Sequence, residues 1–185
     1  MSLKHAILGF LNYTPKTGYE LKNVFDTSVQ HFWPADQSQI YRTLARLADK
    51  GLAEVEVIPQ EDRPVRKEYH ITPAGREELR RWLAQPLIEQ DDRHASLIQV
   101  FFAGQLGDAE ILAMFEQEAQ RVQSRLARYD EVPQQSQPYA DTLGSPREVH
   151  FWMLTLECGI HSARAHLAWL ESVIERLKNN QIPSA

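Results

Sequence analysis

Cysteine and long apolar runs are scarce in this 185-residue chain. The single cysteine, Cys158, cannot form a disulfide within the chain, and it excludes any zinc site built on paired cysteines. The apolar run near the N-terminus is far shorter than the ~20 residues of a membrane span, and it lacks the pattern of a cleaved signal. These absences predict a cytoplasmic protein. A hydrophobic content of 43% is sufficient to form the core of one domain or the cores of two small ones.

Positive charge is also scarce, since 20 Lys and Arg face 25 Asp and Glu, a net charge of −5. Such a balance argues against a nucleic-acid partner, because affinity for DNA depends on cations that neutralise phosphates. The two halves differ, however. Residues 1–84 contain 12 basic and 11 acidic side chains, whereas residues 85–185 contain 8 and 14. Only the first half is suited to a polyanion, and there the placement of the charges must matter more than their sum.

The motifs of common enzyme classes are absent too. The sequence has no G-x-S-x-G elbow, P-loop, H-E-x-x-H or dinucleotide fingerprint. It therefore predicts a protein that is not an enzyme and needs no cofactor.

Three short helices are predicted in the first half. Apolar residues recur at helical spacing over residues 2–12. Thr17 and Glu20 form a capping box, in which each side chain can satisfy a free backbone N–H group at the start of a second helix. A third helix begins after Asp36, a typical N-cap, and ends at Gly51.

The third predicted helix has two distinct faces. Ile40, Leu44 and Leu47 form an apolar stripe, and polar side chains lie opposite at about 100° per residue. Gln and Arg can bind base edges, and Ser and Tyr can bind phosphates, so the polar face suits the major groove of DNA. The alternative is a solvated face on an ordinary three-helix bundle. The polar residues concerned are Ser38, Gln39, Tyr41, Arg42 and Arg46.

A β-hairpin is predicted next, because residues 53–58 and 67–72 alternate with the period of a strand. Three helices followed by a hairpin indicate a winged helix, whose wing contacts the backbone or minor groove of DNA. A fourth helix follows, from Pro73 to Leu83. The basic residues at the hairpin tip and its exit are Arg63, Arg66 and Lys67.

The order and spacing of several motifs resemble the PadR family of transcriptional regulators over residues 3–84. The segments that carry the resemblance are ILGFL at 7–11, GYEL at 18–21, QIYRTL at 39–44, RKEY at 66–69 and TPAGR at 72–76. Several motifs in the right order are far more specific than a lone helix-turn-helix pattern.

The resemblance implies a homodimer that binds an inverted-repeat operator near a promoter, usually as a repressor, and that senses phenolic or other aromatic compounds. Glu61 and Asp62 depart from a strongly basic wing tip. The alternative is a winged helix that binds proteins and has no specific contact with DNA. The DNA contacts carried over from the family are Tyr19, Ser38, Gln39, Tyr41, Arg42, Arg63 and Lys67.

The second half, residues 87–185, is predicted to be an all-α domain for dimerisation and possible effector binding, after a winged-helix domain of residues 1–86. An apolar helix near residues 97–102 precedes a long helix that is expected to stop at Pro133. Residues 133–146 are rich in Pro, Gln and Ser and predict a loop. Ser145, followed by a proline, then marks the start of a long C-terminal helix.

Apolar residues of that last helix follow one another at alternating steps of four and three, which is typical of a helix pairing seam. A protein that binds a palindrome needs twofold symmetry, which favours a dimer interface. The alternative is packing within one chain, against the preceding long helix. The seam consists of Val149, Met153, Leu156, Ile160, Ala163, Leu167, Leu170, Ile174 and Leu177.

The second half offers two further candidate sites, one of which also includes a residue of the first half. Glu157, Cys158 and His161 suggest a metal- or redox-responsive regulator, but a polar stripe is the simpler interpretation and no metal is predicted. Four aromatic residues predict an effector pocket between the two halves, with ordinary core packing as the alternative. They are Trp82, Phe102, Trp152 and Trp169.

Overall fold

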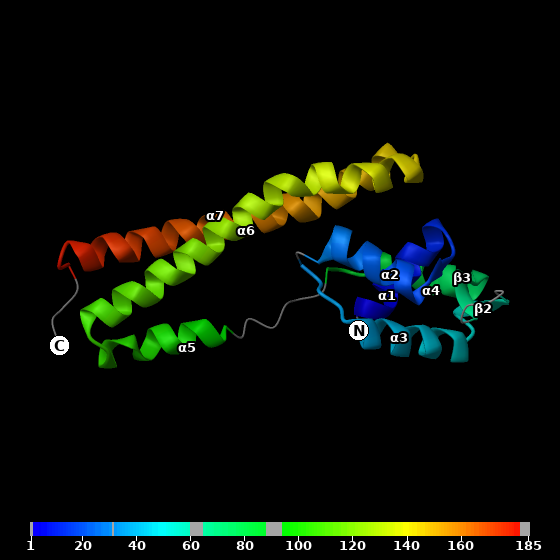
Figure 1. The fold of residues 1–185 in the computed structure, drawn as a ribbon, viewed down its shortest axis with the longest axis horizontal. Coiled ribbons are helices and arrows are strands. Elements are labelled where there is room, and N and C mark those ends of the chain that lie inside the picture. The colour runs from blue at the N-terminus through cyan, green and yellow to red at the C-terminus, as the bar shows by residue number, and fades with distance from the viewer. Residues whose placement is uncertain (1, 31, 60–64, 88–93, 182–185) are drawn as a thin grey trace. The chain divides into compact units, whose positions relative to one another are not determined.

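The chain forms two compact units, residues 1–88 and 89–185, each with a hydrophobic core of its own (Figure 1). The computed structural model describes residues 2–30, 32–59, 65–87 and 94–181. These residues contain seven α-helices and one small three-stranded sheet, so the predicted mainly helical class is confirmed. None of the described helices combines the length and apolar character that crossing a membrane requires.

The first unit is the predicted winged helix. Its elements are α1 (Ser2–Tyr13), β1 (Lys16–Thr17), α2 (Gly18–Val24), α3 (Gln37–Asp49), β2 (Ala53–Ile58), β3 (Arg66–Ile71) and α4 (Pro73–Leu83). A π-helical turn, Phe25–Val29, extends α2. Each predicted helix and both hairpin strands are present within one or two residues of their expected bounds.

Side-chain caps fix the starts of the short helices. Thr17 Oγ1 accepts a hydrogen bond from the Glu20 amide at 3.1 Å, and the Glu20 carboxylate accepts one from the Thr17 amide at 2.7 Å. Asp36 and Gln39 cap α3 by the same reciprocal pair. Thr72 caps α4. The predicted capping box of α2 and the predicted N-cap of α3 are confirmed.

The sheet has the order β1-β3-β2, with both pairs antiparallel. Strand β1 was not predicted, because its two residues are too few to show a strand period. Side chains alternate between the two faces of a strand. Tyr69 and Ile71 of β3 are buried in the core, so Glu68 and His70 lie on the opposite, outer face.

The core of the first unit holds α3 in place. Ile40 and Leu44 are 0% exposed, and they pack with buried residues of α1 and α2. Burying each such side chain contributes roughly 1.5–3 kcal/mol. Gly75 lets α4 approach closely, because a Cβ there would lie 2.1 Å from the carbonyl oxygen of Leu52. The opposite face of α3 is therefore fixed toward solvent.

The second unit is built around two long helices. Its elements are α5 (Ala95–Phe102), a 3-10 turn (Ala103–Gln105), α6 (Asp108–Leu143) and α7 (Pro146–Lys178). Gly144, in the left-handed region at φ 63°, ends α6 and reverses the chain. Helices α6 and α7 then lie side by side, as Figure 1 shows, and their facing residues form one hydrophobic core.

The predicted end of the long helix at Pro133 and the predicted loop over residues 133–146 are wrong. Helix α6 continues through Pro133 and Pro138 to Leu143. A proline inside a helix removes one backbone hydrogen bond and crowds the preceding turn. Here packing against α7 outweighs that loss: Tyr139 stacks on Trp152 with ring centroids 5.5 Å apart. This pairing joins residues far apart in the sequence, so a local signal could not reveal it.

Candidate nucleic-acid interface

The outer face of α3 carries the side chains that the sequence analysis assigned to DNA. All five of them are exposed, and Tyr19 at the start of α2 is exposed as well. The buried stripe on the other side of α3 prevents the helix from rotating about its axis. The five residues of α3 are Ser38, Gln39, Tyr41, Arg42 and Arg46.

Local hydrogen bonds position two of these side chains. Arg42 Nε donates to the carbonyl oxygen of Ser38 at 3.3 Å, which leaves the outer guanidinium nitrogens to face solvent. Gln39 uses its side-chain oxygen to cap α3, where it accepts from the Asp36 amide at 3.3 Å. The amide nitrogen of Gln39 can still donate to a base or a phosphate.

Tyr41 packs against the start of α2. A Cβ at Gly18 would lie 2.5 Å from the Tyr41 ring, so the ring occupies space that only glycine leaves free. This contact connects the two helices of the helix-turn-helix. The Tyr41 ring, which carries the hydroxyl, is therefore held by contacts with both α2 and α3.

A groove of about 580 Å³ runs beside α3 and is lined by residues of α1, α3 and the turn before α3. Arg42, Arg46 and Lys50 line it at intervals of four residues, which places them on one side of the helix. Lys4 also lines it, but its ammonium group is paired with Glu78 at 2.6 Å. Lys50 was not among the residues predicted to bind DNA, although the four-residue spacing of the three cations could have indicated it.

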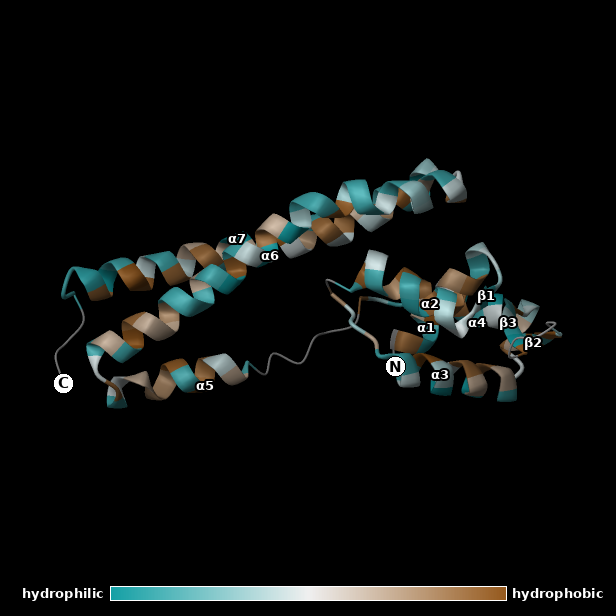
Figure 2. Ribbon diagram, in the orientation of Figure 1, coloured by the Kyte–Doolittle hydropathy of each residue, from teal (hydrophilic) through white to brown (hydrophobic). Residues whose placement is uncertain are grey.

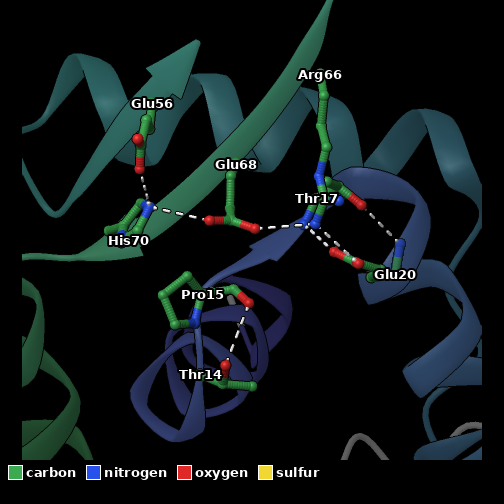
Figure 3. A network of polar contacts seen from close by, with 8 residues as sticks. All are labelled: Thr14, Pro15, Thr17, Glu20, Glu56, Arg66, Glu68 and His70. Atoms are coloured by element: carbon green, nitrogen blue, oxygen red, sulfur yellow. Dashed lines mark hydrogen bonds and ion pairs between the residues drawn. The ribbon is translucent and has the colours of Figure 1, made fainter. Parts of the chain in front are cut away.

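The wing residues have different surroundings. Lys67 is exposed. Arg66 is half-buried, and its Nη2 atom donates to Glu20 at 3.2 Å and to Glu68 at 3.0 Å (Figure 3). Arg66 therefore connects β3 with α2 and already has two anionic partners. Arg63, predicted at the wing tip, lies outside the described residues.

The carboxyl of Glu20 stays ionised in this position. Partial burial opposes its ionisation, but hydrogen bonds from Thr17 and the nearby charges of Arg66 and Lys16 outweigh that effect and lower its pKa. An ionised Glu20 strengthens the hold on Arg66. The base of the wing is thus fixed to the start of α2 by charge as well as by the short pairing of β1 with β3.

The seam of α7 faces α6 of the same chain. From Leu156 on, every second member of the seam is buried in the shared core, and most of the others pack partly against it. This is packing within one chain, the predicted alternative to a dimer interface. The buried members are Leu156, Ala163, Leu170 and Leu177, and the partly buried ones are Met153, Ile160, Leu167 and Ile174. Val149 is half-buried.

Other apolar residues of the second unit are left exposed. Helix α5 has no buried residue, and Figure 2 shows hydrophobic segments along it. Phe101 is 80% exposed there, and Phe151 of α7 is 49% exposed. Monomeric proteins seldom expose large apolar patches unless these serve for contact.

Within the second unit, the predicted pocket aromatics Trp152 and Trp169 do not share one site. Trp82, in the first unit, stacks on His5 at 4.4 Å. Trp152 and Trp169 lie 17 residues apart on α7, about 25 Å at the rise of an α-helix. Phe102 is exposed and contacts Phe101 edge to face.

Trp169 lines a groove of about 310 Å³ between α5, α6 and α7. Its ring contacts Phe115 edge to face and stacks on His166, each at 5.7 Å. Arg121 also lines this groove. The groove thus combines aromatic walls with a cation.

The Glu157, Cys158 and His161 group contains one weak contact. His161 lies 3.7 Å from Glu157, and both are exposed, as is Cys158. In the part of the chain that the structure describes, no further His, Cys, Asp or Glu completes this pair as a metal-binding group.

A three-helix core, a β-hairpin wing and an exposed basic helix together define a winged-helix DNA-binding regulator. Residues 7–81 match the model of the transcriptional regulator PadR-like family, and residues 93–178 match a model described as virulence activator alpha C-term. The chain is 33% identical to the probable transcriptional regulator Rv1176c of Mycobacterium tuberculosis, over 98% of this chain and 100% of that relative. This chain belongs to the PadR-like family of transcriptional regulators.

A second relative is known from solved structures. The negative transcriptional regulator PadR of Bacillus subtilis is 29% identical over 93% of this chain and 95% of its own length. Its crystal structure in complex with operator DNA is similar to this fold with a TM-score of 0.79 and 26% identity, over 96% of this chain and 99% of that one. Its complex with p-coumaric acid gives a TM-score of 0.73 and 25% identity over the same shares. These relatives are transcriptional regulators rather than enzymes.

Proposed function

We propose that the protein is a homodimeric repressor that acts in the cytoplasm, binds an inverted-repeat operator and releases it when a small aromatic acid binds the second unit. The observation that carries this proposal is the row of Arg42, Arg46 and Lys50 on the exposed side of α3. It concentrates positive charge on one helix of a protein whose net charge is −5. The operator complex of Bacillus subtilis PadR supports the same kind of target.

Different residues of the interface are expected to do different things. Arg42, whose outer nitrogens are available, is the residue proposed to bind a base edge in the major groove. Arg46 and Lys50 line the groove beside it and are proposed to bind phosphates. Tyr19 and Lys67 are exposed and are proposed to add phosphate contacts on either side of α3.

The homodimer is proposed to form through the second unit. The seam of α7 is largely covered by α6. The surface proposed to contact a second chain therefore consists of the exposed apolar residues of α5, the outer side of α7 and the partly buried edge of the seam. A twofold dimer would present two copies of α3 to the two halves of an inverted repeat.

The effector is proposed to bind in the groove that Trp169 and Arg121 line. A phenolic acid has a flat ring, which can stack on the indole, and a carboxylate, which can pair with a guanidinium. Arg121 is paired with Glu118 at 3.3 Å, and an exposed pair of this kind is weak enough to exchange for a ligand. The p-coumaric acid complex of the Bacillus subtilis relative supports this ligand class.

The test is a titration of labelled DNA from upstream of the gene, followed by fluorescence anisotropy, with a scrambled duplex as control. We expect a specific complex of one dimer per site, confirmed by sedimentation, and weaker binding when p-coumaric acid is added. Trp169→Ala should bind DNA but lose the response to the acid. Trp152→Ala, on the same helix but away from the groove, should keep it. Equal affinity for both duplexes at low salt would contradict the proposal and favour a protein-binding module.

A further inference from the structure

The outer face of the wing carries three side chains of types that can ligate a metal, Glu56 of β2 and Glu68 and His70 of β3, which we name the wing cluster (Figure 3). The Nε2 atom of His70 lies 3.1 Å from Glu56 Oε2 and 3.4 Å from Glu68 Oε2. The ligand atoms of the three residues all lie within 4.8 Å of one another. None of these residues belongs to the DNA interface described above.

The sheet itself brings these groups together. The register of the hairpin places Glu56 directly opposite Glu68, and two like charges in that position destabilise a sheet. His70 follows two residues later on the same face. Its Nε2 atom is shielded from solvent and forms no hydrogen bond of normal geometry, although both carboxylates are within ion-pair distance. A cation between the three groups would remove the repulsion between the two carboxylates and would be coordinated by the Nε2 atom of His70.

The spacing fits a transition metal. With zinc–nitrogen and zinc–oxygen bonds of about 2.0–2.2 Å, neighbouring ligand atoms of a tetrahedral site lie about 3.3 Å apart. The two separations measured from His70 Nε2 are close to that value. An imidazole ligand favours a transition metal over magnesium or calcium. Paired strands hold the ligands more rigidly than a loop would.

We propose that the wing cluster binds one divalent transition-metal ion such as Zn²⁺, with water completing the coordination, and that the bound ion strengthens DNA binding. The first part of this proposal is independent of the proposed function. The second part rests on it, because it assumes that the wing approaches DNA.

The effect on DNA follows from charge. Glu54, Glu56 and Glu68 share the outer face of the hairpin, and Glu20 adjoins it through Arg66. Four carboxylates against the two cations near Glu20, Arg66 and Lys16, give a formal charge of −2, which repels phosphates, and a divalent ion would change it to 0. Glu68 Oε1 accepts from Arg66 at 3.0 Å while its Oε2 faces His70. A metal on Glu68 would therefore weaken its hold on Arg66 and leave Glu20 as the remaining anionic partner of that cation.

Metal binding is tested without DNA. The full-length protein, treated with a chelator and then dialysed, is titrated with Zn²⁺ by calorimetry and by competition with a zinc-sensitive dye. We expect one ion per chain, with affinity more than about tenfold lower in both His70→Gln and Glu56→Gln. The matched control is His161→Gln, which removes the histidine of the exposed pair with Glu157 and should bind as the wild type does. Equal zinc affinity in the wild type and His70→Gln would overturn the site.

The effect on DNA is tested by anisotropy with and without Zn²⁺. Wild-type affinity should rise roughly three- to tenfold at low salt when zinc is added. Glu56→Gln, which removes one negative charge, should bind more tightly than the wild type without zinc and should not respond to it. A zinc response that persists in Glu56→Gln, or a wild type that binds zinc without any change in DNA affinity, would overturn the second part. If no variant binds specific DNA, the proposed function fails, while the zinc titration still decides the site. Thermal melts confirm that each variant is folded.

Discussion

The first unit is built from short elements, and the longest α-helix among its described residues has 13 residues, whereas the second contains helices of 36 and 33 residues. In the first unit, side-chain caps fix the helix starts, and one core receives residues from all four helices and from the sheet. In the second, the core is a strip between α6 and α7 that extends about 36 Å along α7, from Met153 to Leu177. Stability in the first unit is therefore concentrated, and in the second it is distributed along two helices.

Truncating a central core side chain should show the difference in stability between the two units most clearly. Leu44→Ala is expected to lower the free energy of unfolding of the first unit by about 2–5 kcal/mol, because Leu44 is enclosed on every side. Leu170→Ala, which truncates an equally buried leucine of α7, should affect the second unit toward the lower end of that range, since two helices can close partly over the cavity. Urea titrations monitored by circular dichroism measure both. A greater loss of unfolding free energy for Leu170→Ala than for Leu44→Ala would contradict this difference between the two units.

Loss of one cation should have the next largest effect, and it should be confined to the first unit. Arg42→Ala is expected to weaken specific DNA binding by about 1–3 kcal/mol, because its guanidinium is available to a base edge. Arg128→Ala removes the same charge from the exposed side of α6 and serves as the control, with little change expected. Anisotropy on specific and scrambled duplexes measures the effect. An equal loss on both duplexes would show that Arg42 contacts phosphate alone.

The prolines of the second unit test whether packing holds α6 together. A proline in a helix interior costs about 3 kcal/mol relative to alanine, and a backbone already adapted to the ring would recover only part of that cost on substitution. Pro133→Ala is therefore expected to stabilise the second unit by about 1 kcal/mol. Pro146→Ala is the control, because Pro146 stands in the first turn of α7, where proline suits the helix start. Thermal denaturation that shows no gain for Pro133→Ala would mean that α6 is interrupted near that residue in solution.

The smallest expected effect concerns pH and the contact of α1 with α4. Hydrogen bonds from Lys4, Arg81 and His5 lower the pKa of Glu78 from 4.5 to about 2. Since the folded pKa lies below the ordinary value, the stabilisation is present above pH 4.5 and is lost as the pH falls from 4.5 toward 2. Burial lowers the pKa of His5, which adds a separate loss of stability below pH 6.5.

Glu78→Gln should therefore reduce the melting temperature of the first unit near neutral pH and flatten its decline between pH 4.5 and 2. The neighbouring Glu77 is exposed, so Glu77→Gln changes the same charge without the partners and should follow the wild-type curve. A wild-type curve identical to that of Glu78→Gln would contradict the role of this cluster.

Much of the first unit could be predicted from the sequence because its signals act over short distances. The capping pairs of α2 and α3 each span three residues, and the hairpin strands alternate with a period of two. The exposed face of α3 followed from its apolar stripe, so the positions of Arg42 and Arg46 were predictable. The position of Arg66 was not, because its partner Glu20 lies 46 residues earlier in the chain.

The sequence by itself determined the winged helix, the basic face of α3 and the family, because caps, turn residues and motif order are local properties. Only the tertiary structure decided that α6 passes through Pro133, that the seam of α7 is covered by α6, and that Glu56 meets Glu68 and His70 on the wing. Each of these depends on contacts between segments that the chain must first bring together. The physical reason is that long-range packing can outweigh a local preference of a few kcal/mol, and a linear pattern contains no measure of it.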